Sequence, residues 1–231
     1  MTLLTVGNPK LLKGQKKGYL SSVLHLAPAD LSGKNTCPKA TAGCKAACLN
    51  TAGRGGIFKK GETTNVIQEA RIRKTKYFFD RRQEFLKELT TEIVKTIAKA
   101  EKQGLTPVFR LNGTSDIAWE KYEVTNGKNI FQMFPEVQFY DYTKVLGRKV
   151  SHIPNYHLTF SKADGNDMDV RLALSKGMNV AAVFRTVPQT YLGRAVINGD
   201  ETDLRFLDAS GVVVGLKAKG KAKKDTSGFV V

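Results

Sequence analysis

Short apolar runs alternate with longer segments of helical period along most of this 231-residue chain. Apolar and β-branched runs that stop at polar or proline residues predict strands over 19–28, 106–116, 137–144, 156–162 and 178–185. Apolar positions spaced three and four residues apart predict helices over 62–103, 118–134, 145–152 and 167–176, with Gly127 as a point of interruption in the second. Strands that alternate with helices in this way are typical of βα units and a parallel sheet.

Local signals refine several of these elements. The polar residues around Asp80 predict a break in the long helical region 62–103, and Gly104 is placed to end it. Gly177 is placed as the C-cap of the helix over 167–176. Three further strands are predicted near the end of the chain, over 194–197, 204–206 and 212–216.

The number of βα units bounds the fold. We expect an α/β protein built as an open partial (β/α) barrel of about six mostly parallel strands, because a full eightfold barrel typically needs about 250 residues. The chain length suits a single α/β domain over residues 1–231. Within it, residues 1–18 predict a basic arm or a short edge strand, and residues 217–231 predict a basic C-terminal tail.

The three cysteines, Cys37, Cys44 and Cys48, fall within one short loop after the first predicted strand. A single free cysteine usually packs as a small hydrophobic residue, but three in a loop rich in Lys, Thr and Gly are poor core material. An odd number leaves one thiol over in any disulfide pattern, and nothing marks the chain as secreted. Because thiolates bind soft metals, this grouping favours a metal centre.

The ligand count decides between metals. Structural zinc takes four protein ligands, commonly from paired C-x2–4-C motifs, whereas this loop reads C-x6-C-x3-C with no fourth cysteine. His25 or Asp30 would have to complete a zinc shell from outside that spacing. Three thiolates are enough for an iron–sulfur cluster with one open or empty corner. We therefore expect a [4Fe-4S] or [3Fe-4S] cluster, with zinc, a disulfide and inert thiols as the alternatives.

Polar residues close four of the predicted strands in a repeated way. They form a Thr-Ser-Asp segment, a Thr-Lys pair, a Ser-Lys pair and an Arg-Thr pair, at positions 114–116, 143–144, 161–162 and 185–186. In parallel α/β folds the carboxyl ends of the strands gather at one face and form the ligand site. We expect these strand ends and the cysteine loop to line one pocket.

The chain is strongly basic, with 37 Lys and Arg against 21 Asp and Glu and a formal net charge of +16. Such a field favours nucleic acid, nucleotides or acidic proteins as partners. No apolar run approaches the length of about 18 residues that a membrane span needs. The first residues lack the order of a signal peptide, which favours the cytoplasm. The chain has no HExxH, P-loop or GxSxG motif, which argues against the hydrolases that use them.

Four stretches together resemble the phage gene product 88 family. They are the cysteine loop, RLNGTSDI, FYDYTK, and NGDETDLRFLD with the later GLKAKG. The resemblance covers most of the chain from about residue 20. It implies a bacteriophage origin and expression in the cytoplasm of the bacterial host, and it implies no particular activity.

A more distant resemblance is to the radical S-adenosylmethionine superfamily, in which a three-cysteine loop follows the first strand of a partial (β/α) barrel. That loop holds a [4Fe-4S] cluster whose open iron binds S-adenosylmethionine. The resemblance implies that the cofactor is bound near the segment after the second predicted strand, by Asn112, Gly113, Ser115 and Asp116. The usual spacing in that superfamily is C-x3-C-x2-C with an aromatic residue before the last cysteine, where this chain has Ala47.

Two classes of function follow from these features. As an enzyme, the protein would carry out radical or redox chemistry at the cluster on an anionic substrate. Lys and Arg suit phosphate or carboxylate groups, so the expected substrate-binding residues are Tyr142, Lys144, Ser161, Lys162 and Arg185. As a binding protein, it would keep the cluster or zinc for stability and use its basic surface on nucleic acid or a host protein. The sequence indicates neither a catalytic residue nor an oligomeric state.

Overall fold

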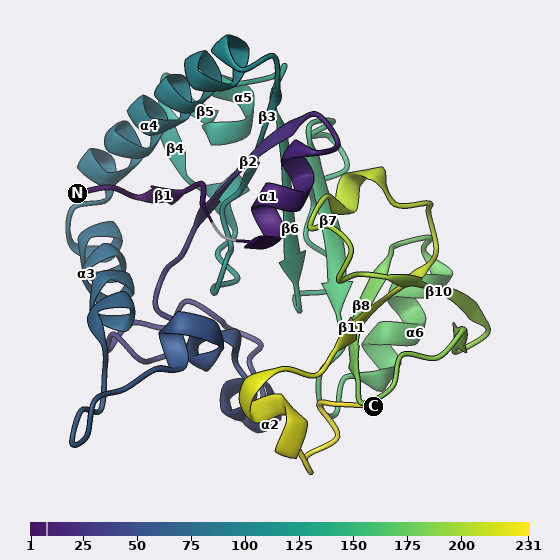
Figure 1. Cartoon of the computed structure of the whole chain (residues 1–231). Coiled ribbons are helices and arrows are strands. Elements are labelled where there is room, and N and C mark those ends of the chain that lie inside the picture. The colour runs from purple at the N-terminus through teal and green to yellow at the C-terminus, as the bar shows by residue number, and fades with distance from the viewer. Residues whose placement is uncertain (8) are drawn as a thin grey trace.

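The computed structural model describes residues 1–7 and 9–231, and its main element is one nine-stranded sheet (Figure 1). In spatial order the strands are β1 (Leu4–Thr5), β2 (Tyr19–Leu24), β3 (Thr106–Arg110), β6 (Gln138–Thr143), β7 (Tyr156–Ser161), β8 (Val180–Phe184), β11 (Val213–Lys217), β10 (Arg194–Asn198) and β9 (Thr190–Tyr191). The strands from β2 to β10 are parallel to one another. An antiparallel strand, β1 or β9, lies at each edge.

Chain order and spatial order agree from β2 to β8, because each of these strands pairs with the one before it. The last three strands depart from this order, because β11 pairs with β8, and β10 and then β9 follow it in reverse chain order. The predicted α/β architecture with a large, mostly parallel sheet is confirmed. The sheet has more strands than expected, and it is not closed into a barrel within the described residues.

The helices connect and cover these strands. They are α1 (Pro9–Gln15), α2 (Ala42–Ala46), α3 (Val66–Asp80), α4 (Arg82–Lys102), α5 (Ile130–Met133) and α6 (Asp167–Ser175), with the 3₁₀ helices η1 (Leu49–Thr51), η2 (Gly53–Gly56), η3 (Trp119–Lys121), η4 (Arg205–Leu207) and η5 (Gly220–Lys224). The break predicted near Asp80 is confirmed, because Arg81 leaves the helical conformation between α3 and α4. Gly104 and Gly177 follow α4 and α6 with φ of 63° and 77°, as their predicted roles require.

Three predicted elements are wrong. The helix over 118–134 is replaced by η3, a hairpin of β4 (Glu123–Thr125) and β5 (Lys128–Asn129), and α5. Asn126 and Gly127 both have positive φ, which is the conformation of a tight hairpin turn. Residues 145–152 form turns around Gly147, whose φ of 84° breaks a helix. The strand predicted over 204–206 is largely η4.

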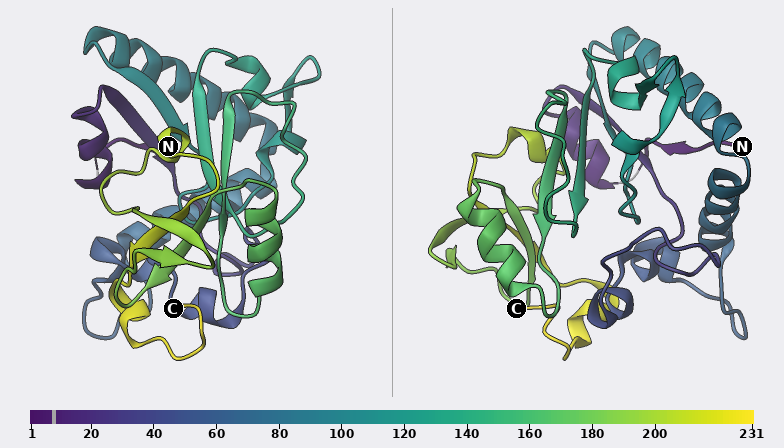
Figure 2. Two further views of the ribbon diagram at one scale, coloured as in Figure 1. Left: turned by 90° about the vertical axis from the view of Figure 1, so that its right-hand side faces the viewer. Right: turned by 180° about the vertical axis from the view of Figure 1, so that it is seen from behind.

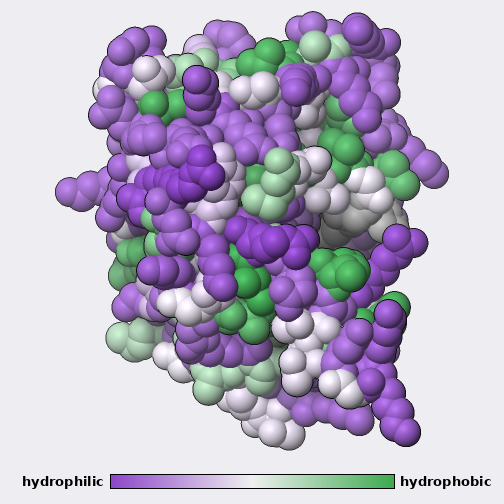
Figure 3. Space-filling view, turned by 90° about the vertical axis from the view of Figure 1, so that its left-hand side faces the viewer, coloured by the Kyte–Doolittle hydropathy of each residue, from purple (hydrophilic) through white to green (hydrophobic). Residues whose placement is uncertain are grey.

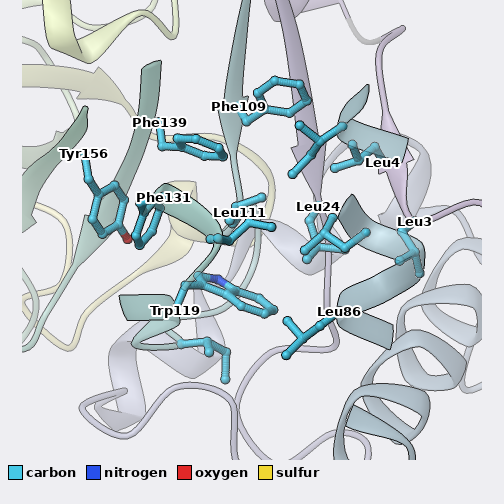
Figure 4. Packing of buried hydrophobic residues seen from close by; sticks show 14 of the residues in the cluster. Leu3, Leu4, Leu24, Leu86, Phe109, Leu111, Trp119, Phe131, Phe139 and Tyr156 are labelled. Atoms are coloured by element: carbon cyan, nitrogen blue, oxygen red, sulfur yellow. The ribbon is translucent and has the colours of Figure 1, made fainter. Parts of the chain in front are cut away.

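The two faces of the sheet differ in character. Phe109 and Phe139 lie on the face that packs against Leu86 of α4 and against Trp119, within the main hydrophobic cluster (Figure 4). Alternate residues of the same strands point to the other face, because side chains alternate along a strand. Those residues include Arg110, next to Phe109 in β3. The second face is therefore partly polar where it approaches the carboxyl ends of the strands.

The helices and the two terminal segments enclose the sheet. In Figure 2, α3 and α4 lie along one side of the molecule and α6 lies along the other. Over α3 and α4 the surface is mostly hydrophilic, with hydrophobic residues in small separate areas (Figure 3). Leu3 and Leu4 are buried in the main cluster, and Val230 forms a bridge with Val183 of β8. Both terminal segments therefore pack against the rest of the fold.

Candidate functional site

A cavity of about 590 Å³ lies at the carboxyl ends of the parallel strands, between the cysteine loop and the C-terminal segment. Its lining includes Cys37, Cys44 and Cys48 together with eight other residues singled out from the sequence, namely Asn112, Gly113, Ser115, Asp116, Tyr142, Lys144, Ser161 and Lys162. Arg185 is not part of this lining, because its guanidinium donates to the carbonyls of Lys223 and Asp225. The structure therefore brings these positions together, and their roles in binding stay predictions.

Cys37 lies in a turn that directs a backbone N–H at its sulfur. The N–H of Ala29 donates to Cys37 Sγ at 3.3 Å, and Thr36 Oγ1 lies 3.7 Å from the same sulfur. Ala29 has φ of 47°, a left-handed conformation that is costly for a residue with a side chain. Observed strain of this kind is common at functional sites.

Short helices place the other two cysteines. Cys44 lies in α2, and Cys48 is the N-cap of η1, where its Sγ accepts from the N–H of Asn50 at 3.5 Å. The two residues are thus held by separate local hydrogen bonds, although they are close in sequence.

Asp164, just beyond β7, fixes the start of α2 from another part of the chain. Its carboxylate accepts from the N–H groups of Gly43 and Cys44 at 3.1 and 3.2 Å, and from the hydroxyl of Thr41. Burial acts to raise the pKa of Asp164, but these hydrogen bonds outweigh it and leave the pKa below its usual value. Asp164 therefore ties the cysteine loop to the end of β7.

The three thiols influence one another. They are free and half-buried. Burial raises the pKa of the Cys37 and Cys48 thiols, and the neighbouring thiols of Cys44 and Cys37 raise that of Cys48 further. Lys144 acts in the opposite direction on the pKa of both, as a cation close to the sulfurs would. A bound metal would have to displace the protons from these thiols.

No group of three or more His, Cys, Asp or Glu side chains in the described part of the chain is arranged to hold a single metal ion. The two residues considered as a fourth zinc ligand are placed elsewhere. His25 lines an adjoining cavity of about 170 Å³ beside Arg71 and Arg110, and burial, followed by these cations, lowers its pKa to about 3. Asp30 pairs with Lys45 at 3.2 Å.

Asn112 uses its side chain inside the protein. Its Oδ1 accepts from Ser115 Oγ, from the N–H of Ile117 and from Trp119 Nε1. Its Nδ2 donates to the carbonyl of Ile117 and to Asp141 Oδ2. Asn112 therefore fixes the loop after β3, and both of its amide protons are already used.

Gly113 is required by close packing of the same loop against β2. A Cβ at this position would lie 2.6 to 2.7 Å from Val23, His25 and the carbonyl of Leu24. Distances this short would force the backbone apart. The missing side chain thus has a structural explanation that does not depend on a cofactor.

Asp116 and Lys144 connect two neighbouring strand ends. Asp116 Oδ2 accepts from the N–H of Lys144 at 2.8 Å, and Asp116 Oδ1 lies 3.5 Å from Arg148 Nη1. The Lys144 ammonium makes no hydrogen bond or ion pair with the described residues. It is therefore available to a ligand in the cavity.

The C-terminal segment closes one side of the cavity, which the sequence did not predict. The buried ammonium of Lys162 donates to the carbonyl of Gly228. Ala218, Ala222 and Val230 pack with Ala47 of the cysteine loop. Three lysines of this segment join the lining, Lys217, Lys219 and Lys221. The only signal for them in the sequence was the basic character of the tail.

Arg110 and Asp203 form a second group that sequence reasoning missed. Arg110 Nη1 donates to Asp203 Oδ2 at 3.0 Å, and the guanidinium lies 4.6 Å from the centre of the Tyr142 ring. Burial acts to lower the pKa of Arg110, but the acidic groups around it, Asp203 first, together outweigh burial and keep the guanidinium charged. An arginine that ends a parallel strand was the available signal.

A family model described as Gene product 88 matches residues 2–231. The chain belongs to the gene product 88 family. The expected phage family and bacteriophage origin are thereby supported. Neither a curated protein nor a solved structure matches the chain, so the likeness to the radical S-adenosylmethionine superfamily has no support. Among the described residues, no helix has the length and apolar character needed to cross a membrane.

Proposed function

We propose that this gene product 88 protein binds an iron–sulfur cluster through Cys37, Cys44 and Cys48, and that the rest of the cavity lined by these cysteines receives an anionic small molecule. One observation carries the proposal: three free thiols from a single loop line one cavity at the carboxyl ends of parallel strands. In parallel α/β folds this edge is the usual place for a ligand.

The number of donors favours a cluster over a single zinc ion. The three thiols share one cavity, and no group of three or more ligating side chains among the described residues is arranged around a single ion. Structural zinc takes four protein ligands, whereas the loop supplies three. Three thiolates are enough for a cubane cluster with one open iron. A bound cluster would supply one-electron redox chemistry.

The surroundings of the sulfurs also fit the proposal. N–H groups of Ala29 and Asn50 donate to two of the sulfurs, and such bonds tune the potential of a cluster. Lys144 stabilises the thiolate forms of Cys37 and Cys48. These interactions would offset part of the negative charge of three bound thiolates.

The test is the metal and sulfide content of protein purified without oxygen, with a visible spectrum before and after dithionite. We expect iron and sulfide in near-equal amounts and a broad absorbance that bleaches on reduction. C37S, C44S and C48S should each lose most of the iron and should be less stable, because metal binding contributes folding free energy.

Lys45→Ala provides the matched control, because Lys45 lies beside Cys44 in α2 and its ion pair with Asp30 is exposed. This variant should keep its iron. One zinc per chain without sulfide would replace the cluster with a zinc site. Metal-free protein, or cysteine variants that keep their iron, would overturn the metal centre altogether.

A further inference from the structure

The charges around the cavity are unevenly paired. Its lining carries four carboxylates, Asp30, Asp116, Asp200 and Asp203, and seven cations. Each of these carboxylates lies within ion-pair distance of an arginine or lysine. Lys162, a further cation, donates to a backbone carbonyl. The lining therefore has a surplus of positive charge that the protein does not neutralise locally.

The surplus is carried by three ammonium groups. Those of Lys144, Lys217 and Lys221 make no hydrogen bond or ion pair with any described residue. Lys144 is half-buried after β6, whereas Lys217 and Lys221 are exposed, at the end of β11 and in η5. Like charges gathered around one cavity repel one another, so an anion that enters the cavity is favoured.

The chemistry of these groups favours phosphate over carboxylate. Arginine binds a carboxylate through two parallel hydrogen bonds, and the one arginine of the lining is already paired with Asp203. Lysines act as separate point charges, which suits the several oxygens of a phosphate or polyphosphate. Lys144 after β6 and two lysines of the C-terminal segment can contact different oxygens of one such group.

The cavity also offers surface for an organic part of the ligand. Leu31, Leu49 and Phe58 line it, and 42%, 55% and 37% of their respective surfaces are exposed. On the buried side, Arg110 Nε and the hydroxyl of Tyr142 have no hydrogen-bond partner among the described residues. A volume of about 590 Å³ is within the range of sites for small organic ligands.

We propose that the cavity binds an organic phosphate of nucleotide size. The phosphates contact Lys144, Lys217 and Lys221, and the organic part packs against Leu31, Leu49 and Phe58. This inference rests on the proposed function, because it names the chemical class of the anion that the same cavity would receive. The lysines that carry it are not cluster ligands.

The test measures binding of ATP, pyrophosphate and adenosine to the full-length protein by calorimetry. ATP should bind most tightly, pyrophosphate more weakly, and adenosine least. The double variant K217A/K221A should weaken ATP binding at least about tenfold, because it removes two of the three charged groups that contact the phosphates. The exposed position of both lysines keeps the fold intact in this variant.

K223A/K224A is the matched control. It removes the same charge from η5, and neither residue lines the cavity. Its affinity for ATP should stay within about twofold of the unmodified protein, since the remaining effect is screened long-range attraction. Equal losses in both double variants would overturn the site. The site would also be overturned if neither ATP nor pyrophosphate bound. Binding of a single-stranded oligonucleotide by protein that does not bind ATP would overturn it as well.

C44S separates this inference from the cluster proposal. Iron-free C44S that still binds ATP would support the phosphate site independently of the cluster. Iron-loaded protein that binds neither ATP nor pyrophosphate would overturn the phosphate site and leave the cluster standing.

Discussion

At the scale of single residues, Asp141 shows how buried polar groups hold the strand ends in place. Its Oδ1 accepts from the N–H of Asn112 at 2.7 Å, and its Oδ2 accepts from Asn112 Nδ2 and the Tyr156 hydroxyl at 3.1 and 2.9 Å. Burial raises its pKa to about 7, although Arg110 and the hydrogen bonds act against this. The folded protein therefore keeps a proton on Asp141 that the unfolded chain, with a pKa of 3.8, releases.

This shift fixes the sign of a pH dependence. The contribution of Asp141 to stability is fully present below pH 3.8 and is lost as the pH rises through about 7. Asp141→Asn cannot titrate, so its free energy of unfolding should fall less steeply over this range. Urea unfolding at a series of pH values measures both curves. Asp80→Asn, an exposed change in α3, should follow the unmodified protein. Parallel curves for Asp141→Asn would contradict the raised pKa.

At the scale of elements, α2 depends on a residue far away in the sequence. Asp164 accepts from the N–H of Cys44 across 120 residues, and it shares that N–H with Thr41, the N-cap of α2. The cysteine helix has only five residues, so it cannot be stable alone. The position of α2 over the cavity therefore depends on Asp164 at the end of β7 as much as on the loop itself.

Removal of the Asp164 carboxylate, which supplements the Thr41 cap, should weaken the cysteine loop. We expect Asp164→Ala to lower the free energy of unfolding by about 1–2 kcal/mol at neutral pH, the usual cost of a lost helix cap. The pKa of Asp164 is lowered in the folded state, so the deficit should shrink as the pH falls below 3.8. Urea titrations of both proteins at neutral and acidic pH measure this. Asp30→Ala, whose ion pair is exposed, should change stability little.

Elements set by local chemistry could be predicted from the sequence. The break between α3 and α4 and the end of α6 follow from polar and glycine residues next to each helix. The hairpin of β4 and β5 was missed because Val124, Ile130 and Phe131 imitate helical spacing, whereas the Asn126-Gly127 turn decides the structure. In short apolar runs of this kind, the turn residues predict the structure better than the apolar spacing does.

At the scale of the whole molecule, the convergence of the site could be predicted because a parallel sheet gathers its strand ends at one edge. That rule places Lys144, Ser161 and the cysteine loop together. It says nothing about Asp164 or the lysines of the C-terminal segment, which reach the cavity through tertiary contacts between distant parts of the chain. For Arg185 the rule predicts too much. The residue stands at a strand end, but its side chain binds the backbone of the C-terminal segment and does not line the cavity.

The C-terminal segment should be a structural part of the site. Val231 N–H donates to the carbonyl of Val183, Arg185 N–H donates to the carbonyl of Val231, and Val230 is buried. Deletion of residues 226–231 also removes the carbonyl that accepts from Lys162. We expect a loss of about 3 kcal/mol, the sum of one buried valine and two backbone hydrogen bonds.

Chemical denaturation of the full chain, the deletion and Val230→Ala should give a graded series. Val230→Ala keeps the backbone hydrogen bonds and loses only part of one buried side chain, so it should cost about 1–2 kcal/mol. The deletion should cost more, because Lys162 is then left with a buried charge and no acceptor. An unchanged urea midpoint in the deletion would mean that the segment only rests on the cavity. In that case the cysteine loop and the strand ends would have to form the site without it.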